Sequence, residues 1–234
     1  MQPLKESSHF KRKGEHFHRQ GVYERALIYW NREIKLHPRN ADAYHNKSIA
    51  LELIGKKKEA LLYIDRAISL DPNLASAYFC KGRLLRGMGG KKEEILDYLD
   101  KAISLNPGDA ISLCSKGILL DEMGKSEEAI DCYHEALRLN PNFAEVYCSE
   151  GNALKNLGKK QEAIECYNEA IRLKPNLRES YNNKRSILSD MEKNEEALSC
   201  YDQVIHLDPD YASAYFNLFD VAFFLGSESG SMQN

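Results

Sequence analysis

Cysteine and histidine are the residue types with the most chemistry to offer in this sequence, since both can bind metals or take part in nucleophilic catalysis. The chain has 6 cysteines and 7 histidines among its 234 residues. No Cys-x-x-Cys pair occurs and no zinc-binding spacing is present. His16 and His18, two residues apart on one helix, would point about 200° from each other. The sequence therefore predicts no metal site.

Three cysteines, Cys132, Cys166 and Cys200, form a ladder with a spacing of 34 residues. Equivalent residues of stacked helices lie about 8–10 Å apart or more, beyond the limit of about 7 Å between the Cα atoms of a disulfide. The N-terminus is charged where a secretory signal peptide needs an apolar stretch. We therefore expect reduced thiols at half-buried positions of a cytoplasmic protein.

Composition and motifs argue against several classes of function. The sequence contains no glycine-rich phosphate loop and no nucleophile–base constellation, so we expect neither an enzyme nor a cofactor. Lys+Arg 32 against Asp+Glu 35 gives a net charge of −3, which provides no basic excess to hold nucleic acid. No run of about 18 apolar residues is present, so no membrane span is expected either.

The prolines show the scale of the elements that must position any functional residue. After Pro3 they follow one another at steps of 34 or 35 residues: Pro38, Pro72, Pro107, Pro141, Pro175 and Pro209. The chain is 43% hydrophobic, which is enough for a packed core. A fixed period of this length indicates a repeat array.

Each repeat contains two amphipathic helices. In residues 144–177, apolar or small residues recur at i, i+4 and i+7 in both halves, Gly158 lies between the halves, and Pro175 follows the second. The eighth position of the repeats is small where two helices approach closely: Gly14, Ser48, Gly82, Gly117 and Gly151. Glycine ends the first helix of most repeats, as at Gly55 and Gly124, and alanine recurs in the second, as at Ala60 and Ala163.

This pattern resembles the tetratricopeptide repeat family over residues 7–226. The resemblance implies an all-α, right-handed α-solenoid of helix-turn-helix repeats of 34 residues, with about six full repeats and a terminal helix. The expected domain organisation is an N-terminal flank 1–6, an array 7–226, and a disordered tail 227–234. The expected repeats are 7–40, 41–74, 75–109, 110–143, 144–177, 178–211 and a half-repeat 212–226.

Two repeats depart from the pattern. The third has one extra residue at Gly89–Gly90 and Ile95 in place of the small alanine, so its hairpin is expected to be displaced. In the sixth, Arg185 stands at the small position and Glu192 at the glycine position. Because an arginine at a close helix crossing either turns outward or overpacks, the sixth repeat should be the loosest hairpin.

In the family, the first helix of each pair lines a concave groove that binds protein or peptide, so the resemblance implies such a groove here. At the corresponding positions this sequence has mostly short polar or apolar side chains, which suit an extended peptide. The predicted groove residues are Lys11, Asn46, Ile49, Phe79, Arg83, Ile111, Ser115, Ile118, Ser149, Asn152, Asn183 and Asn217.

A more specific family function, the carboxylate clamp of co-chaperones, is disfavoured. Lys11 and Asn46 match its motif, but Glu15, Ser76 and Cys80 occupy its other three places. Glu15 would repel the carboxylate that the clamp binds.

The groove positions carry opposite charge along the chain, with a sum of +2 in the first three repeats and −5 in the remainder. The predicted ligand is a peptide segment or helix with an apolar anchor at repeats two to four. It is expected to be acidic toward the N-terminal end of the array and basic toward the other end. Two alternatives remain: the targeting arm of a larger enzyme, or an assembly scaffold that acts through its ends and convex face.

The last half-repeat is unusually aromatic. Phe216, Phe219, Phe223 and Phe224 cannot all be buried by the same contact with the sixth repeat. The helix is expected either to cap the array and cover as many of them as it can, or to dock on a second copy as a homodimer or on the remainder of a longer chain.

Overall fold

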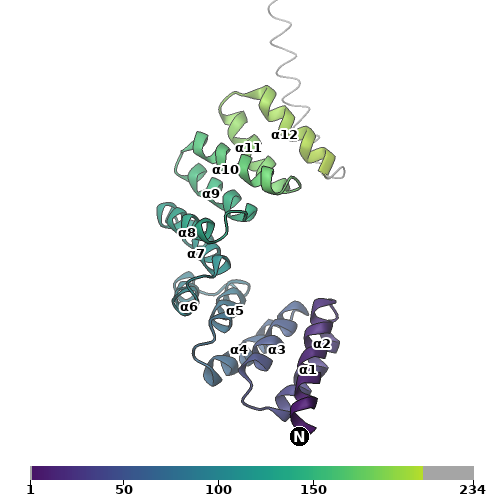
Figure 1. The fold of residues 1–234 in the computed structure, drawn as a ribbon. Helices are drawn as coiled ribbons and strands as arrows, with labels where there is room; N and C mark the ends of the chain where they lie inside the picture. The colour runs from purple at the N-terminus through teal and green to yellow at the C-terminus, as the bar shows by residue number, and fades with distance from the viewer. Residues whose placement is uncertain (1, 208–234) are drawn as a thin grey trace, which may run out of the picture. The chain divides into compact units, whose positions relative to one another are not determined.

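The computed structural model describes residues 2–207, and within this range the chain forms twelve α-helices joined by short turns, without a strand (Figure 1). The predicted all-α fold of helix-turn-helix repeats is confirmed. The chain divides into two compact units, which we call unit 1 (Met1–Lys116) and unit 2 (from Gly117), with the boundary inside α7 (Ala110–Glu122).

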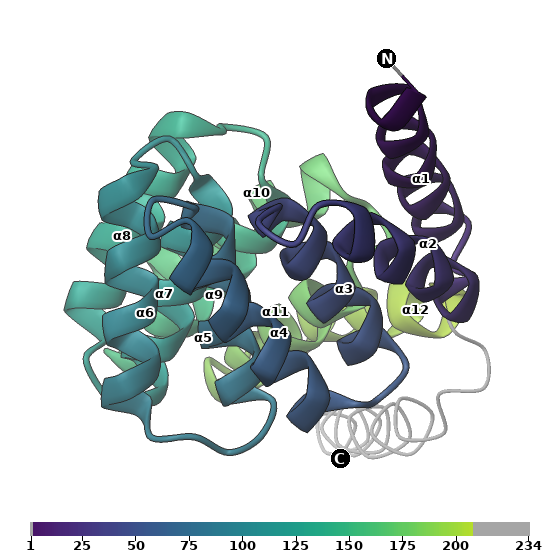
Figure 2. The ribbon, with the colours of Figure 1, turned by 90° about the horizontal axis from the view of Figure 1, so that it is seen from below.

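Unit 1 contains six complete helices and the first half of α7. The six are α1 (Gln2–Arg19), α2 (Tyr23–Leu36), α3 (Ala41–Leu53), α4 (Lys57–Leu70), α5 (Ala75–Arg86) and α6 (Lys92–Leu105). From α1 to α6 each helix packs against its neighbour in the sequence, so α2 lies between α1 and α3, and α4 lies between α3 and α5 (Figure 2). Helix α1 begins well before the first expected repeat.

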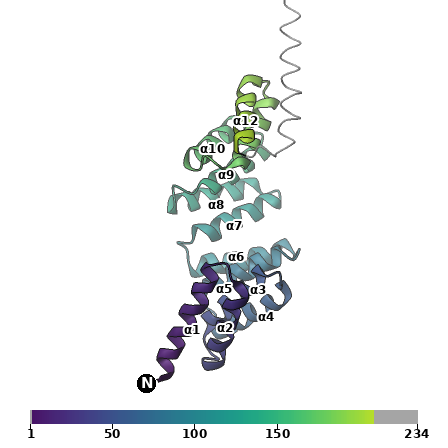
Figure 3. The same cartoon turned by 90° about the vertical axis from the view of Figure 1, so that its right-hand side faces the viewer.

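Unit 2 continues the pattern with five complete helices in the described residues. They are α8 (Ser126–Leu139), α9 (Ala144–Asn156), α10 (Lys160–Leu173), α11 (Arg178–Asp190) and α12 (Asn194–Leu207). From α8 onward each helix again packs on the next, which places α9 between α8 and α10 (Figure 3).

The regularly spaced prolines end the second helices. The residues that precede Pro38, Pro72, Pro107, Pro141 and Pro175 have φ between −129° and −138°, outside the helical region. A proline ring clashes with a helical residue before it, so the chain must leave the helix at this point. The proline period therefore determines where each repeat turns into the next.

The first helices end with one residue in the left-handed region. Five of these residues are glycines with φ between +73° and +81°: Gly21, Gly55, Gly89, Gly124 and Gly158. In the sixth repeat Glu192 takes the same conformation, with φ of +59°. A residue with a Cβ pays about 1–2 kcal/mol for this region, so the sixth turn is strained.

The small eighth position is explained by an aromatic ring on the second helix. A Cβ on Gly151 would lie 2.6 Å from Cε1 of Tyr167, and one on Gly14 would lie 2.7 Å from the ring of Trp30. In the third repeat the opposing residue is Leu99, and a Cβ on Gly82 would meet nothing closer than 3.5 Å. A glycine is therefore required only where a ring stands opposite it.

In every described hairpin except the third, an alanine on the second helix closes the core. Ala26, Ala60, Ala129, Ala163 and Ala197 have no exposed surface. Ile95 replaces alanine in the third repeat and is itself 2% exposed, and the extra residue of that repeat lies in the connection between α5 and α6. The third hairpin thus accommodates its larger side chain within the core.

We expect the sixth hairpin to exchange its amide hydrogens fastest within unit 2. Its turn carries the strained Glu192, and Arg185 is half-buried at the position that is glycine in the fifth repeat. Hydrogen exchange followed by mass spectrometry should show less protection in α11 and α12 than in α9 and α10. Equal or greater protection in the sixth hairpin would contradict this expectation.

Candidate functional site

The first helices of unit 1 present their predicted groove residues along one side. Ile111 is the most exposed, at 54%, whereas Ile49 and Phe79 are half-buried and pack on the core formed by α3, α4 and α5. Phe79, Arg83 and Ser115 also line a shallow depression over Ile95. Unit 1 therefore has apolar groove positions, of which Ile49 and Phe79 are held by the core and Ile111 is exposed.

Charges at the groove positions of unit 1 are paired between neighbouring first helices. Lys11 Nζ lies 3.8 Å from Asp42 Oδ2, and Arg83 Nη2 donates to Glu52 Oε2 at 2.8 Å. Burial raises the pKa of Glu52, although Arg83 opposes this effect. The two members of each pair are 31 residues apart in the sequence. This spacing of opposite charges was not used to predict the pairs. The cationic residues Lys11 and Arg83 thus contribute to the stacking of repeats.

Cys80 and His45 form a second contact between α3 and α5. Cys80 Sγ lies 3.4 Å from His45 Nε2, and Cys80 is 5% exposed. Burial raises the pKa of the Cys80 thiol and lowers the pKa of His45. Because the thiolate is the reactive form, this arrangement favours packing over nucleophilic chemistry. Asn46, next to His45 on α3, is half-buried.

Unit 2 brings predicted groove residues together in a hollow of about 400 Å³, which we call the groove hollow. It collects Ile118 of α7 with Ser149 and Asn152 of α9, so three predicted positions share one site. Its lining is Ile118, Asp121, Glu122, Tyr133, Glu145, Cys148, Ser149, Asn152, Leu177 and Glu179. Four carboxylates thus surround an apolar floor.

Asparagines connect the first helices beside the groove hollow. Asn152 Oδ1 accepts hydrogen bonds from Tyr167 Oη at 2.7 Å and from Asn183 Nδ2 at 2.8 Å. Asn156 Nδ2 donates to both oxygens of Asp121, at 3.2 and 3.1 Å. Asn152 and Asn183, both predicted as ligand contacts, are therefore also bonded to each other across repeats.

Asp121 and Glu145 are held by hydrogen bonds. Ser126 Oγ donates to Asp121 Oδ1 at 2.6 Å, which orients that carboxylate. Lys174 Nζ lies 2.6 Å from Glu145 Oε1, and its hydrogen bond lowers the pKa of Glu145. Glu145 therefore stays ionised at neutral pH, and its charge is balanced by Lys174.

Some predicted features lie outside the described residues: Asn217 of the groove and the four phenylalanines Phe216, Phe219, Phe223 and Phe224. Self-association through these phenylalanines stays a prediction. Within residues 2–207, no group of three or more His, Cys, Asp or Glu side chains is placed to hold a metal ion. None of the described helices is both long enough and apolar enough to pass through a lipid bilayer.

The paired helices and their repeated turns define a helical-repeat protein. Family models described as tetratricopeptide repeat match residues 12–75, 110–143 and 144–177, and one described as TPR repeat matches residues 186–219. The chain belongs to the tetratricopeptide repeat family.

One curated relative is the uncharacterized protein MJ0572 of Methanocaldococcus jannaschii, which is 36% identical over 56 residues. The match covers 24% of this chain and 65% of that protein. The chain thus spans less than two thirds of the relative's length.

Solved structures share the fold. PilW, a type IV pilus biogenesis factor, aligns with a TM-score of 0.82 and 18% identity over 91% of this chain and 98% of that one. PilF of Pseudomonas aeruginosa gives a TM-score of 0.81 and 18% identity over 94% of this chain and 100% of that one. YrrB, described as a TPR protein with an unusual peptide-binding site, gives 0.64 and 23% identity over 80% and 96%. At these identities the likeness concerns the fold alone.

Proposed function

We propose that this chain is a non-catalytic interaction protein that binds a peptide segment or helix of a partner at the groove positions of its first helices. The observation that carries the proposal is the groove hollow of unit 2, where three predicted groove residues lie among four carboxylates. The segment bound there would carry a lysine or arginine beside an apolar residue.

The lining of the groove hollow explains both parts of this ligand. Ile118, Cys148 and Leu177 form an apolar floor that can bury an aliphatic side chain. Glu179, on the first turn of α11, is exposed at the edge, where it can meet a basic side chain. Charge complementarity of this kind contributes mainly to specificity and to the rate of association.

Unit 1 supports the apolar part of the proposal independently. Ile111, a predicted groove residue, is 54% exposed although its side chain is large and aliphatic. Exposed aliphatic side chains in a groove are typical of protein-binding surfaces. The alternatives, a targeting arm of a larger enzyme and an assembly scaffold, would not require peptide binding at either place.

Selection of random peptides displayed on phage against the whole chain tests the proposal. We expect selected peptides to contain a basic residue next to an apolar one, and one group of them to lose about tenfold or more in affinity with Glu179→Lys. Fluorescence anisotropy with synthetic copies of the peptides measures the loss.

Glu127→Lys is the matched control, because Glu127 is also an exposed acid on the first turn of a helix, α8, but lies outside the groove hollow. Binding of that peptide group should be unchanged in this variant. If Glu179→Lys leaves the affinity of every selected peptide unchanged, peptide binding in the groove hollow is wrong.

A further inference from the structure

A lysine–aspartate pair joins consecutive repeats on another side of the first helices. Lys81 Nζ of α5 lies 2.7 Å from Asp65 Oδ1 of α4, and Lys116 Nζ lies 2.6 Å from Asp100 Oδ1 of α6. Lys81 also lies over the ring of Tyr98, 4.5 Å from its centroid. The lysine thus fills the space between two second helices with its aliphatic stem.

The fifth repeat reverses this arrangement. Glu150 of α9 stands at the lysine position, His134 of α8 at the aspartate position, and Cys166 of α10 at the tyrosine position. His134 Nε2 lies 2.9 Å from Glu150 Oε1. Glu150 is only 7% exposed, and burial raises its pKa while His134 opposes the effect. A buried carboxylate therefore replaces a half-buried ammonium group.

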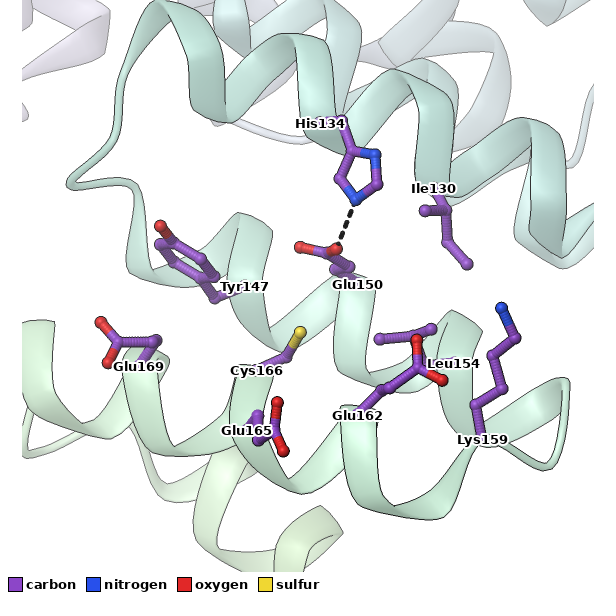
Figure 4. A pocket seen from close by; sticks show the side chains of 10 residues that line it. All are labelled: Ile130, His134, Tyr147, Glu150, Leu154, Lys159, Glu162, Glu165, Cys166 and Glu169. Carbon is purple, nitrogen blue, oxygen red and sulfur yellow. Dashed lines mark hydrogen bonds and ion pairs between the residues drawn. The ribbon is translucent and has the colours of Figure 1, made fainter.

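The exchange of lysine and tyrosine for glutamate and cysteine removes side-chain volume, and a hollow of about 340 Å³ lies there (Figure 4). We call it the rear hollow, because it lies on the other side of α9 from the groove hollow. Cys148 lines the groove hollow, and Glu150, two residues later on the same helix, points about 200° from it around the helix axis. Figure 4 shows side chains from α8, α9 and α10 around it, together with the cationic Lys159 of the turn between α9 and α10. They are Ile130, His134, Tyr147, Glu150, Leu154, Lys159, Glu162, Glu165, Cys166 and Glu169.

The rear hollow combines an apolar wall with an acidic rim. Ile130, Tyr147 and Leu154 offer aliphatic and aromatic surface, and Glu150 lies among them. Glu162 and Glu165 are exposed at the rim. This is the surrounding that a lysine or arginine side chain needs, with an apolar channel for its stem and a carboxylate for its charged end.

We propose that the rear hollow binds a lysine or arginine side chain of a partner protein. The incoming side chain lies against Tyr147 and Leu154 and directs its charge toward Glu150. It restores from outside the cation that Lys81 supplies within the third repeat. The site is separate from the groove hollow, so it adds a second contact surface to the proposed function.

The test fills the rear hollow with larger side chains of the chain itself. The triple variant His134→Asp, Glu150→Lys, Cys166→Tyr recreates the combination of Asp65, Lys81 and Tyr98, which the chain already folds around. Random peptides displayed on phage are selected against the whole wild-type chain. We expect a second group of peptides whose lysine or arginine is essential and whose affinity falls about tenfold or more in the triple variant. Circular dichroism and thermal melting check that the variant is folded.

A milder variant keeps the test decisive if the triple variant does not fold. Glu162→Lys changes one exposed rim charge and should weaken the same peptides while Glu179→Lys and Glu127→Lys leave them unchanged. The two hollows are thereby tested separately, since each has its own variant. The proposal is overturned if no selected peptide depends on its basic residue, or if affinities are the same in wild type, Glu162→Lys and any folded triple variant.

Discussion

Replacing Gly151 with alanine is expected to lower the free energy of unfolding by about 1–2 kcal/mol. A Cβ at this position would lie 2.6 Å from the ring of Tyr167, and overpacking of this kind costs about 1–3 kcal/mol. The better helix propensity of alanine offsets up to about 1 kcal/mol of that cost. Urea denaturation followed by circular dichroism measures the difference.

Gly82 provides the control for this prediction. It occupies the same repeat position, but its Cβ would be 3.5 Å from the nearest side-chain atom. Gly82→Ala should therefore stabilise the chain by about 0.5–1 kcal/mol. Gly151→Ala should also become harmless when combined with Tyr167→Leu, since Leu99 leaves room opposite Gly82. A loss of equal size in both backgrounds would show that the ring is not the cause.

Replacing Glu192 with glycine is expected to raise the free energy of unfolding by about 1 kcal/mol. Glu192 ends its helix at φ of +59°, a conformation that costs a residue with a Cβ about 1–2 kcal/mol. Glycine takes this conformation at little steric cost, so the strain in the sixth hairpin is relieved. The same urea titration reports the gain.

The reverse substitution at the equivalent turn checks the cause. Gly158 has φ of +76°, and a Cβ there would meet no atom within 4 Å. Gly158→Ala therefore introduces backbone strain without a clash and should cost about 1–2 kcal/mol. If Gly158→Ala is neutral, or Glu192→Gly destabilises, the left-handed turn does not control this hairpin.

Much of the fold could be predicted because its signals are local and repeated. Proline excludes a helical residue before it, and glycine permits the left-handed turn, so both mark helix ends directly in the sequence. The reason for the small position was less accessible. Periodicity indicates a close helix crossing, but only the structure shows that Tyr167 or Trp30 stands opposite and that Gly82 has space to spare.

The site was harder to predict because its residues have two uses. Lys11, Arg83, Asn152 and Asn183 have the polar character of ligand contacts, yet each also bonds a neighbouring first helix. Spacings of 31 residues between opposite charges could have revealed two of these pairs. The rear hollow forms because the fifth repeat has Glu150 and Cys166 where the third has the larger Lys81 and Tyr98. Its size depends on how α8, α9 and α10 pack together.

The buried thiols make the chain its own reporter of local opening. Burial raises the pKa of Cys148 to about 11 and that of Cys166 to about 12. At neutral pH these groups remain protonated, and only the thiolate reacts with alkylating reagents. Alkylation at each buried cysteine therefore follows the transient exposure of its own helix. Cys80 monitors one unit, while Cys148 and Cys200 monitor the fifth and sixth repeats of the other, and the half-buried Cys166 monitors access to the rear hollow.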